Sequence, residues 1–344
     1  MKNTTMNAIV FESEGKLALK DVAIPTIQEP EDVIVEIEVC SICGTDVKIM
    51  DVPPGYAAKP DVILGHEIVA KVIEIGEKVK YLKIGDRVVV NPNDFCGVCK
   101  YCLNNMPNQC ESINALGVFT DGGFAEYARI PEKILYKIAP DLSARKAVFA
   151  EPLACVINGM DKIRVMPGDS ALVMGAGPIG LLVVQLLKAS GVSPIIVSEP
   201  SKLRQEFAQK SGADYVIDPR VDDLPSFCQE VTKGGVDVVV ELVGSQIKAA
   251  IQAVRKGGKI LLFGLNTQVE PQVPQSEIIF KEITLYGTWI ANASFSKAVK
   301  VLESDILDVE SLITHTFPIS KVREGLDLLR SGEAIEILVD PKIV

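Results

Sequence analysis

The chain has little of what directs a protein to nucleic acids, membranes or the cell exterior. It carries 35 Lys and Arg against 45 Asp and Glu, a formal net charge of −10, and it has only two histidines. An acidic chain lacks the basic face that nucleic acid or an anionic membrane requires. Residues 1–10 lack the apolar core of a signal peptide, and no run of about 18 apolar residues follows. We therefore expect a cytoplasmic protein whose partner is a small molecule.

Disulfides are not expected, although the chain has eight cysteines among 344 residues. Chains that need disulfides are typically small and secreted, and thiolate chemistry suits a larger one better. The crowded set is Cys96, Cys99, Cys102 and Cys110, with the spacing CxxCxxCx7C. Four thiolates at loop spacings can close a tetrahedron around a structural zinc. The alternatives are cysteines without metal and an iron–sulfur cluster, which the missing proline after the fourth cysteine disfavours.

Two kinds of pattern divide the chain. Up to residue 90, short alternating strands between turn residues predict a barrel-like β region, with strands at 8–11, 33–39, 68–75 and 87–90. After Pro167, apolar strands alternate with helices, which predicts βαβ units and a parallel sheet. The expected strands are 171–174, 195–198, 215–217, 236–241, 259–263 and 283–286, and the expected helices are 178–190, 202–210, 224–231 and 246–253. A helix at 295–302 and a strand at 334–342, which returns to the first region, complete the pattern.

A glycine-rich turn links the first strand of the parallel region to its first helix. The turn reads GxGxxG and consists of Gly175, Ala176, Gly177, Pro178, Ile179 and Gly180. Such glycines permit a tight turn, close approach of a pyrophosphate and helix-to-strand packing, while the helix N-terminus faces the phosphates. Glu199 ends the next strand, where a carboxylate accepts bonds from ribose hydroxyls and repels a 2′-phosphate, so NAD is favoured over NADP. A glycine-rich turn in an unrelated α/β fold is the alternative.

A second, mixed set of metal ligands is available around Cys43. Cys43 and the pair His66 and Glu67 lie at expected strand ends, and Glu151 offers a further carboxylate. A catalytic zinc takes nitrogen, sulfur and oxygen ligands and keeps one position open to water or substrate. The residues alone leave open which carboxylate is the ligand, and also leave open a purely structural histidine.

Together these motifs resemble the zinc-containing medium-chain dehydrogenase/reductase superfamily, specifically its polyol (sorbitol) dehydrogenase and threonine dehydrogenase branch. The resemblance spans nearly the whole chain. Its elements, in order, are Cys43-Gly44-Thr45-Asp46, Gly65-His66-Glu67, Gly85-Asp86-Arg87-Val88, the four cysteines, Gly122-Gly123-Phe124-Ala125-Glu126-Tyr127, Glu151-Pro152-Leu153 and the glycine-rich turn. It implies an α/β chain in which a GroES-like β-barrel catalytic domain, 1–154 with a zinc lobe at 92–117, holds an inserted Rossmann domain. That insert, 155–291, would carry a doubly wound parallel six-stranded sheet, and 292–344 would return to the catalytic domain.

The resemblance also implies roles for individual residues. Cys43, His66 and Glu67 would bind the catalytic zinc, with Glu151 as an alternating or water-linked ligand. Thr45 would take the proton of the alcohol. The implied reaction is Lewis-acid activation of a secondary alcohol, such as a polyol or sugar alcohol, and hydride transfer to NAD. With the four-cysteine site, this gives one structural and one catalytic zinc in each chain.

Three further positions bear on the ligands of the resembled family. Arg204 matches a place where such enzymes often set an arginine near the adenosine. Lys48 stands where many relatives carry the histidine that ends a proton relay, so the relay runs through solvent or Lys48 serves another purpose, such as pairing with an anion. Ile290 aligns with the arginine by which sorbitol dehydrogenases meet the polyol. L-threonine and a polyol phosphate therefore stay open as alternative substrates.

Two expectations concern the chain as a whole. The last strand of the parallel region, 283–286, is apolar and lies at the sheet edge, which predicts a homo-oligomer, a tetramer or a dimer. A non-catalytic nucleotide-binding protein is the alternative from a different class. A complete open set of metal ligands argues against it, because a binding module has no use for one.

Overall fold

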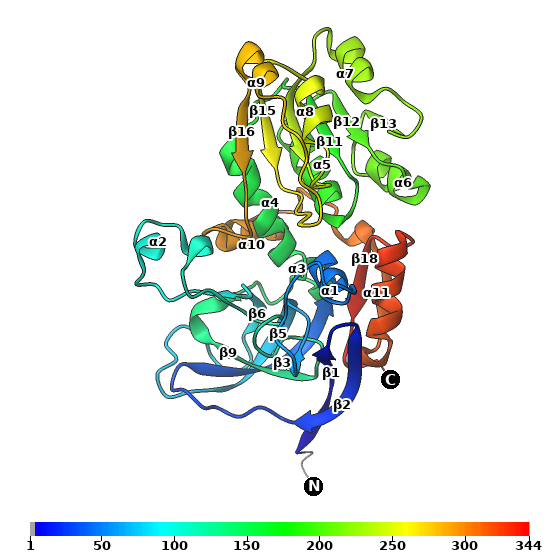
Figure 1. Cartoon of the computed structure of the whole chain (residues 1–344). Coiled ribbons are helices and arrows are strands. Elements are labelled where there is room, and N and C mark those ends of the chain that lie inside the picture. Colours follow the sequence, from blue (N-terminus) through cyan, green and yellow to red (C-terminus); the bar gives the residue numbers. More distant parts are fainter. Residues whose placement is uncertain (1–3, 344) are drawn as a thin grey trace. The chain divides into compact units, whose positions relative to one another are not determined.

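The computed structural model describes residues 4–343, which form two compact units. Unit 1 combines the residues up to Ala154 with Asn292–Ser304 and the segment from Val309 onward. Unit 2 consists of Cys155–Ala291 and Asp305–Asp308. One helix, α4 (Ala150–Ile163), begins in unit 1 and ends in unit 2. Figure 1 shows both units with the chain coloured along its length.

Unit 1 is built mainly of β-strands. They are β1 (Thr5–Ser13), β2 (Lys16–Ala23), β3 (Asp32–Ser41), β4 (Val62–Ile63), β5 (Glu67–Ile75), β6 (Arg87–Val90), β7 (Asn93–Asp94), β8 (Asn114–Ala115), β9 (Tyr127–Pro131), β10 (Leu135–Lys137), β17 (Ile313–Phe317) and β18 (Glu336–Val339). The main sheet has the order β10-β6-β5-β3-β18-β17, and β9 also pairs with β3. A sheet β2-β1-β4 and the pair β7-β8 accompany it. The predicted return of the C-terminal strand to the first region is confirmed, since β18 pairs with β3.

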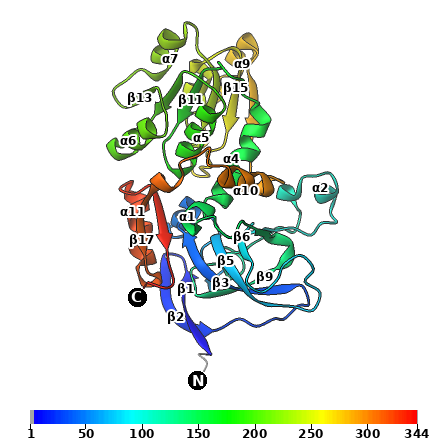
Figure 2. The same cartoon turned by 180° about the vertical axis from the view of Figure 1, so that it is seen from behind.

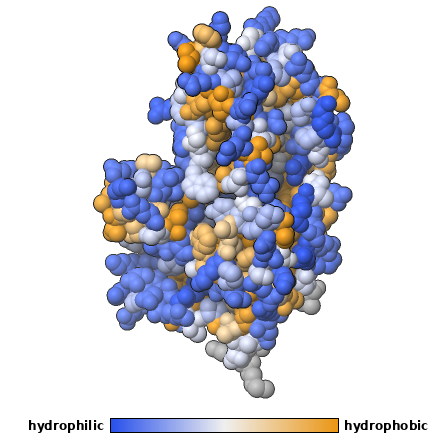
Figure 3. Space-filling model, viewed as in Figure 1, coloured by the Kyte–Doolittle hydropathy of each residue, from blue (hydrophilic) through white to orange (hydrophobic). Residues whose placement is uncertain are grey.

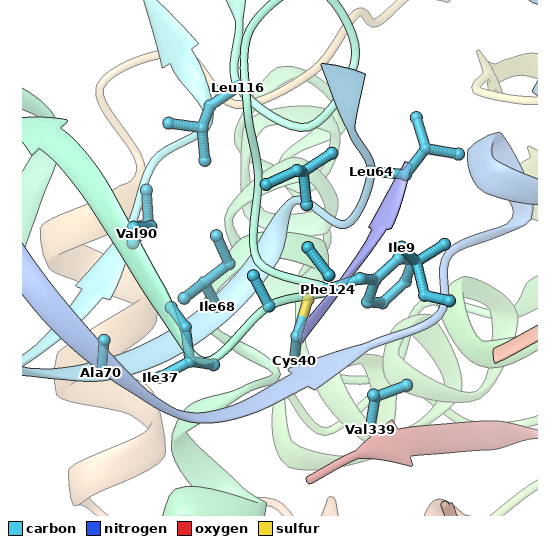
Figure 4. Packing of buried hydrophobic residues seen from close by; sticks show 14 of the residues in the cluster. Ile9, Ile37, Cys40, Leu64, Ile68, Ala70, Val90, Leu116, Phe124 and Val339 are labelled. Atoms are coloured by element: carbon cyan, nitrogen blue, oxygen red, sulfur yellow. The ribbon is translucent and has the colours of Figure 1, made fainter. Parts of the chain in front are cut away.

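The core of unit 1 fixes the chain next to the expected metal ligands. The ring of Phe124 is completely buried and lies among Ile9, Cys40 and other apolar side chains (Figure 4). Gly65, just before His66, has a φ of +89°, and a Cβ there would lie 2.7 Å from Phe124 Cδ1. Only glycine fits both the left-handed backbone and the contact with the ring. Packing in the core therefore fixes the backbone conformation at Gly65, the residue before His66.

Helices cover parts of unit 1. They are α1 (Gly44–Ile49), α2 (Lys100–Leu103), α3 (Ala144–Ala147), α10 (Phe295–Glu303), α11 (Val322–Ser331) and the 3-10 turns η1 (Pro107–Gln109), η2 (Glu132–Ile134), η3 (Glu310–Leu312) and η4 (Ile319–Lys321). The sequence reading missed α11, which packs on α1 and β18. Its residues Val322, Leu326 and Leu329 are buried, the spacing of an apolar helix face. Gly332, with φ 76°, ends the helix in the left-handed conformation.

Unit 2 contains the predicted six-stranded parallel sheet. Its strands are β11 (Ala171–Met174), β12 (Ile195–Ser198), β13 (Tyr215–Ile217), β14 (Val236–Glu241), β15 (Val254–Leu262) and β16 (Thr284–Gly287), in the order β13-β12-β11-β14-β15-β16. The chain order reverses between β11 and β14, and open α/β sheets bind ligands at the carboxyl ends of strands at such a point. The strand expected at 259–263 begins earlier, because β14 already pairs with β15 at Val254 before a bulge.

Helices cover both faces of this sheet. They are α5 (Pro178–Ala189), α6 (Lys202–Lys210), α7 (Leu224–Thr232), α8 (Ile247–Ala253) and α9 (Gln275–Lys281), shown from both sides in Figures 1 and 2. Every residue of β11 and β12 is buried, and successive side chains of a strand point to opposite faces, so neither face is open to water. Residues of α7, α8 and α9 pack on one face. The doubly wound arrangement is thus confirmed.

The surface holds an apolar area on the lobe around α2 (Figure 3). Val98 and Leu103 there are exposed, with 75% and 71% of their surface accessible. Within residues 4–343 no helix combines the length and the apolar character needed to cross a membrane.

Candidate functional site

The first expected metal ligand, Cys43, lies where β3 gives way to α1. Cys43 is the N-cap of α1 with an extended backbone, and its N–H donates to Asp46 Oδ2 over 3.0 Å. This is one half of a capping box, which satisfies donors at the helix start and favours a negative charge there. Asp46 is completely buried. The capping interaction therefore holds both Cys43 and the buried carboxylate of Asp46 in place.

His66 and Glu67 reach Cys43 from the neighbouring strand. Glu67 opens β5 opposite Ser41, the last residue of β3. Ligand atoms of Cys43, His66 and Glu67 all lie within 4.8 Å of one another. His66 Nδ1 faces Asp46 Oδ1 at 3.5 Å, and neither atom has a hydrogen-bond partner among the described residues. A thiol, an imidazole and a carboxylate make a donor set that fits zinc with one position open.

Burial and neighbouring charges perturb all three groups. Burial raises the pKa of the Cys43 thiol to about 12. Burial, followed by the charge of Glu151, raises the pKa of Glu67 to about 7. Burial alone lowers the pKa of His66, but Asp46 and Cys43 outweigh it and hold that pKa well above its usual value. Thiolate and carboxylates crowded away from water call for a cation to compensate them.

Glu151 adds charge to the cluster but does not join the three converging atoms. It lies in the first turn of α4 and is buried, with 8% of its surface exposed. Its charge raises the pKa of Glu67. The sequence left both carboxylates open, and the geometry groups Glu67, rather than Glu151, with Cys43 and His66.

The two remaining expected catalytic residues, Thr45 and Lys48, lie on α1. They are three residues apart on the helix and share a face, and both are partly exposed. Thr45 stands in the first turn of α1, two residues after Cys43, so it lies in the same part of unit 1 as Cys43.

The four-cysteine lobe brings its sulfur atoms together around a common centre. The Cys110–Cys96, Cys99–Cys102 and Cys96–Cys102 sulfurs are 3.5, 3.6 and 4.0 Å apart. A tetrahedron with Zn–S bonds of about 2.3 Å has edges of about 3.8 Å, so the spacing fits zinc. Backbone N–H groups of Val98 and Cys99 bond to the Cys96 sulfur and lower the pKa of that thiol to about 6, which favours the thiolate.

The glycine-rich turn has the local geometry of a phosphate site. Gly175 follows β11 with a φ of +101°, and a Cβ on Gly180 would lie 2.1 Å from Gly175 O, so close packing requires glycine there. Gly177 caps α5, which starts with Pro178 and Ile179 in its first turn, and a Cβ on Gly177 would meet nothing within 4 Å. The N-terminus of α5 therefore opens onto free space that a pyrophosphate can enter.

Glu199 is tied by its carboxylate to two neighbouring backbone segments. Glu199 Oε2 accepts from Ala176 N and Oε1 accepts from Ser201 N, each over 2.8 Å. It thus both braces the glycine-rich turn and caps the start of α6, and only 3% of its surface is exposed. An ionised carboxylate has about four lone-pair sites, so each oxygen retains one for a further donor. Arg204, on α6, has a buried Nε without a hydrogen-bond partner among the described residues.

The sequence analysis missed two buried polar residues, Asn158 and Glu336. Asn158, on α4, donates from Nδ2 to Trp289 O over 3.2 Å and to Ile290 O over 2.7 Å. It steadies a loop in which Ile290 has a φ of 38°, unusual for a branched side chain. Glu336, on β18, is buried beside Glu67. The sequence does contain a sign that Glu336 is unusual, because it is a single carboxylate inside the apolar run 334–339. No residue near Asn158 in the sequence indicates its hydrogen-bond partners.

Two family models match most of the chain between them. Residues 29–140 match the alcohol dehydrogenase GroES-like domain, and residues 178–304 match the zinc-binding dehydrogenase domain. Among curated relatives, D-arabinitol dehydrogenase 1 of Uromyces fabae is 34% identical over 98% of this chain and 97% of its own length. An L-threonine 3-dehydrogenase of Pyrococcus horikoshii is 36% identical over 90% of this chain and 91% of its own.

Solved structures show the same fold over nearly the whole chain. A zinc-binding dehydrogenase of Sinorhizobium meliloti, bound to NADP, has a TM-score of 0.92 and 29% identity, covering 98% of this chain and 100% of its own. An alcohol dehydrogenase of Escherichia coli, complexed with NADH, gives the same TM-score, identity and coverage. The expected GroES-like domain, the Rossmann-type domain and the expected enzyme class are thereby confirmed. The chain belongs to the zinc-binding alcohol dehydrogenase family and is a zinc-dependent oxidoreductase of alcohols.

Proposed function

We propose that this enzyme oxidises a secondary alcohol group of a polyol, with NAD as the hydride acceptor, at Cys43, His66 and Glu67. The observation that carries the proposal is the convergence of these three donors within 4.8 Å in one unit, beside a buried Asp46. Zinc held there supplies Lewis acidity that lowers the pKa of an alcohol hydroxyl, and bound nicotinamide accepts the hydride.

Residues around the proposed zinc ligands orient the histidine and transfer the proton of the alcohol. Asp46 orients the His66 ring from behind, as carboxylates commonly do for metal-binding histidines. Thr45 accepts the proton of the substrate hydroxyl, because its own hydroxyl lies in the helical turn that starts at Cys43. Lys48, on the same helix face, hands that proton to solvent or pairs with an anionic group of the substrate. A second zinc, held by the four cysteines, stabilises the lobe.

The cofactor is assigned to unit 2. The turn from Gly175 to Gly180 and the start of α5 receive the pyrophosphate, with Pro178 and Ile179 in the first turn of α5. Glu199 accepts the ribose hydroxyls with the lone pairs that its backbone bonds leave, and its charge disfavours a 2′-phosphate. Arg204 lies on the adenosine side. The relatives of known structure include one with NADH and one with NADP, so the preference for NAD rests on Glu199.

The domain roles follow from these assignments. We assign catalysis to 1–154 with its zinc lobe at 92–117, together with 292–344, and NAD binding to 155–291. All eight cysteines are free, including the exposed Cys96, and we propose a cytoplasmic location because reduced thiols are typical of that compartment.

A homotetramer is the proposed assembly. The edge strand β16 carries no partner on one side among the described strands, and such edges are usually paired or covered. On α9, Ile279 and Phe280 are exposed, with 62% and 80% of their surface accessible. Pairing of two copies along β16 and a second contact at the apolar lobe around α2 would make a tetramer.

Substrate choice is tested by a spectrophotometric screen of polyols, polyol phosphates and L-threonine, each with NAD and with NADP. We expect reduction of NAD with a polyol. The relatives include a D-arabinitol dehydrogenase as well as threonine dehydrogenases, which supports a polyol substrate. Turnover of L-threonine with no polyol turned over would replace the polyol by the amino alcohol, and turnover of none would refute the substrate class.

A further inference from the structure

An ion pair lies next to the proposed ribose position in unit 2 and has no part in the function described above. Glu199 follows strand β12, and Asp218 follows strand β13. These two strands pair in parallel with Ser198 opposite Ile217, and Glu199 N donates to Ile217 O over 3.0 Å. Residues that follow neighbouring parallel strands lie at the same edge of a sheet, the edge at which such folds bind their ligands. Glu199 and Asp218 are therefore neighbours where the cofactor is assigned.

Arg220 connects these two strand ends. Its Nε donates to Asp218 Oδ1 over 2.9 Å, and its Nη2 donates to Asp218 Oδ2 over 2.6 Å. Nη2 also donates over 2.7 Å to the carbonyl oxygen of Pro200, the residue directly after Glu199. The hydrogen bonds and the charge of Asp218 raise the pKa of Arg220, and the charge of Glu199 adds to this effect. The guanidinium therefore lies within electrostatic reach of the proposed ribose ligand.

These bonds occupy the N–H groups with which an arginine binds phosphate best. A guanidinium has five N–H donors, and two parallel bonds from it make the strongest contact with a phosphate. Asp218 engages the pair formed by Nε and Nη2, and Pro200 O engages Nη2 again. Only Nη1 is left without a hydrogen-bond partner among residues 4–343. A phosphate at this place would therefore find one nitrogen of Arg220 instead of a pair.

Asp218 is the fixed partner of this ion pair. Only 12% of its side chain is exposed, against 64% for Arg220. Asp218 Oδ1 also accepts from the backbone N of Arg220 over 3.0 Å, and Asp218 N donates to Asp222 Oδ2 over 2.9 Å. The bonds from Arg220 lower the pKa of Asp218 to about 2, with a smaller contribution from the charge of Lys202. Asp218 is thus ionised at neutral pH and keeps the more exposed arginine in place.

We propose that Asp218 is a second determinant of cofactor choice, which holds the Arg220 guanidinium against Pro200 and so withholds it from the 2′-phosphate of NADP. The inference rests on the proposed placement of the ribose at Glu199. With Asp218 present, a 2′-phosphate meets two carboxylates and an arginine that is already engaged. Without the charge of Asp218, it meets one carboxylate and an arginine whose paired N–H groups are free. NAD lacks this phosphate, so its affinity does not depend on the state of Arg220.

Asp218→Asn tests the proposal, because it removes the charge and keeps an Oδ1 that accepts from the backbone N of Arg220. Zinc-loaded enzyme is titrated with NADPH and with NADH, and binding is followed by nucleotide fluorescence. The Kd for NADPH should fall by about 3- to 10-fold, a range between an exposed ion pair and a bidentate phosphate contact, while the Kd for NADH stays within about twofold of wild type.

A second background shows whether the gain comes through Arg220. In Arg220→Leu, the further change Asp218→Asn should lower the Kd for NADPH by less than about twofold, because no guanidinium is left to release and salt screens the remaining repulsion. Glu206→Gln is the matched control. It removes one exposed acid from α6 in the same unit and should leave both Kd values unchanged. Thermal unfolding without cofactor is measured for every variant.

Three results would overturn the inference. An unchanged Kd for NADPH in Asp218→Asn would show that Arg220 is not withheld. The same gain in the Arg220→Leu background would show that loss of the charge alone is responsible. An equal loss of affinity for both cofactors, with a lowered melting temperature, would show that Asp218 serves only the fold of the loop after β13.

Glu199→Ala separates these results from failure of the proposed cofactor site. If Glu199→Ala changes the ratio of NADH to NADPH affinity and Asp218→Asn does not, the ribose lies at Glu199 and only the role of Asp218 is wrong. If Glu199→Ala leaves that ratio unchanged, the ribose does not lie at Glu199, and the proposed site fails together with the inference that rests on it.

Discussion

Replacement of Glu199 by alanine removes two kinds of interaction that can be measured separately. In the structure, the Glu199 carboxylate accepts from Ala176 N and from Ser201 N, each over 2.8 Å. In the proposed complex, it also accepts from the ribose of NAD. Loss of the backbone bonds affects the folded protein without cofactor, and loss of the ribose bonds affects only the affinity for cofactor.

The two effects have different expected sizes. Ala176 is completely buried, so its N–H would be left without a partner, at a cost of about 1–3 kcal/mol in the free energy of unfolding. Ser201 is partly exposed, and water can replace its bond. Loss of a hydrogen bond to a charged acceptor costs about 1.5–3 kcal/mol of binding, which is a rise in the Kd for NADH of roughly 10- to 150-fold. The Kd for NADPH should rise less or fall, because the like charge is gone.

NADH and NADPH fluorescence titrations give both affinities, and thermal unfolding without cofactor gives the stability. Glu206→Ala is the matched control, since Glu206 is an exposed acid on the same helix, α6, and should change neither quantity. An unchanged ratio of NADH to NADPH affinity in Glu199→Ala, with lowered stability, would show that Glu199 only braces the turn and caps α6. Equal use of NADP and NAD by the wild type would likewise refute its role in cofactor choice.

Four further outcomes are expected. Cys43→Ser should abolish turnover and lose one zinc with little change in melting temperature, whereas Cys99→Ser should chiefly lower stability. Elemental analysis and calorimetry check both variants. The opposite pattern would mean that the catalytic and the structural zinc have been assigned to the wrong ligand sets. Chelation should remove the open-site zinc first and activity with it, and loss of lobe zinc before activity would contradict this. Gly180→Ala should lower the free energy of unfolding by about 1–3 kcal/mol, because its Cβ would meet Gly175 O. Gly177→Ala should leave stability unchanged and weaken NADH binding. Equal melting temperatures of the two variants would contradict the different packing of the two glycines. Sedimentation at micromolar concentration should give a tetramer, and a monomer would refute pairing along β16.

The parallel sheet of unit 2 was predictable because its central strands β11, β12 and β14 are almost wholly buried and read as nearly continuous apolar runs. β11, β12, β13 and β14 have the predicted bounds. β2, with the sequence KLALKDVA, was not predicted, because half-exposed positions and charges obscure its alternation. β17 and α11 were missed for a similar reason: their burial depends on partners far away in the chain, such as β18 and α1.

Prediction of the sites had the same limit. The sequence predicted the mixed set of ligands because Cys43, His66 and Glu67 stand in short motifs. It predicted the second site because the spacing of the four cysteines is typical of a zinc site. Glu336 could not be predicted to lie near Glu67, because the two residues become neighbours only through the pairing of β18, β3 and β5. A buried polar residue whose neighbours lie far away in the sequence carries little local signal, since strand order rather than adjacent residues sets its surroundings.

The assignment of an open zinc site to Cys43, His66 and Glu67 is tested most directly by zinc content and turnover measured on the same samples of wild type and His66→Ala. The wild type should contain two zinc ions per chain, one for each ligand set, and should reduce NAD with the polyol that the screen identifies. His66→Ala should contain only the lobe zinc and show no turnover. A His66→Ala variant that keeps both zinc ions, or that turns over with only one, would contradict the assignment.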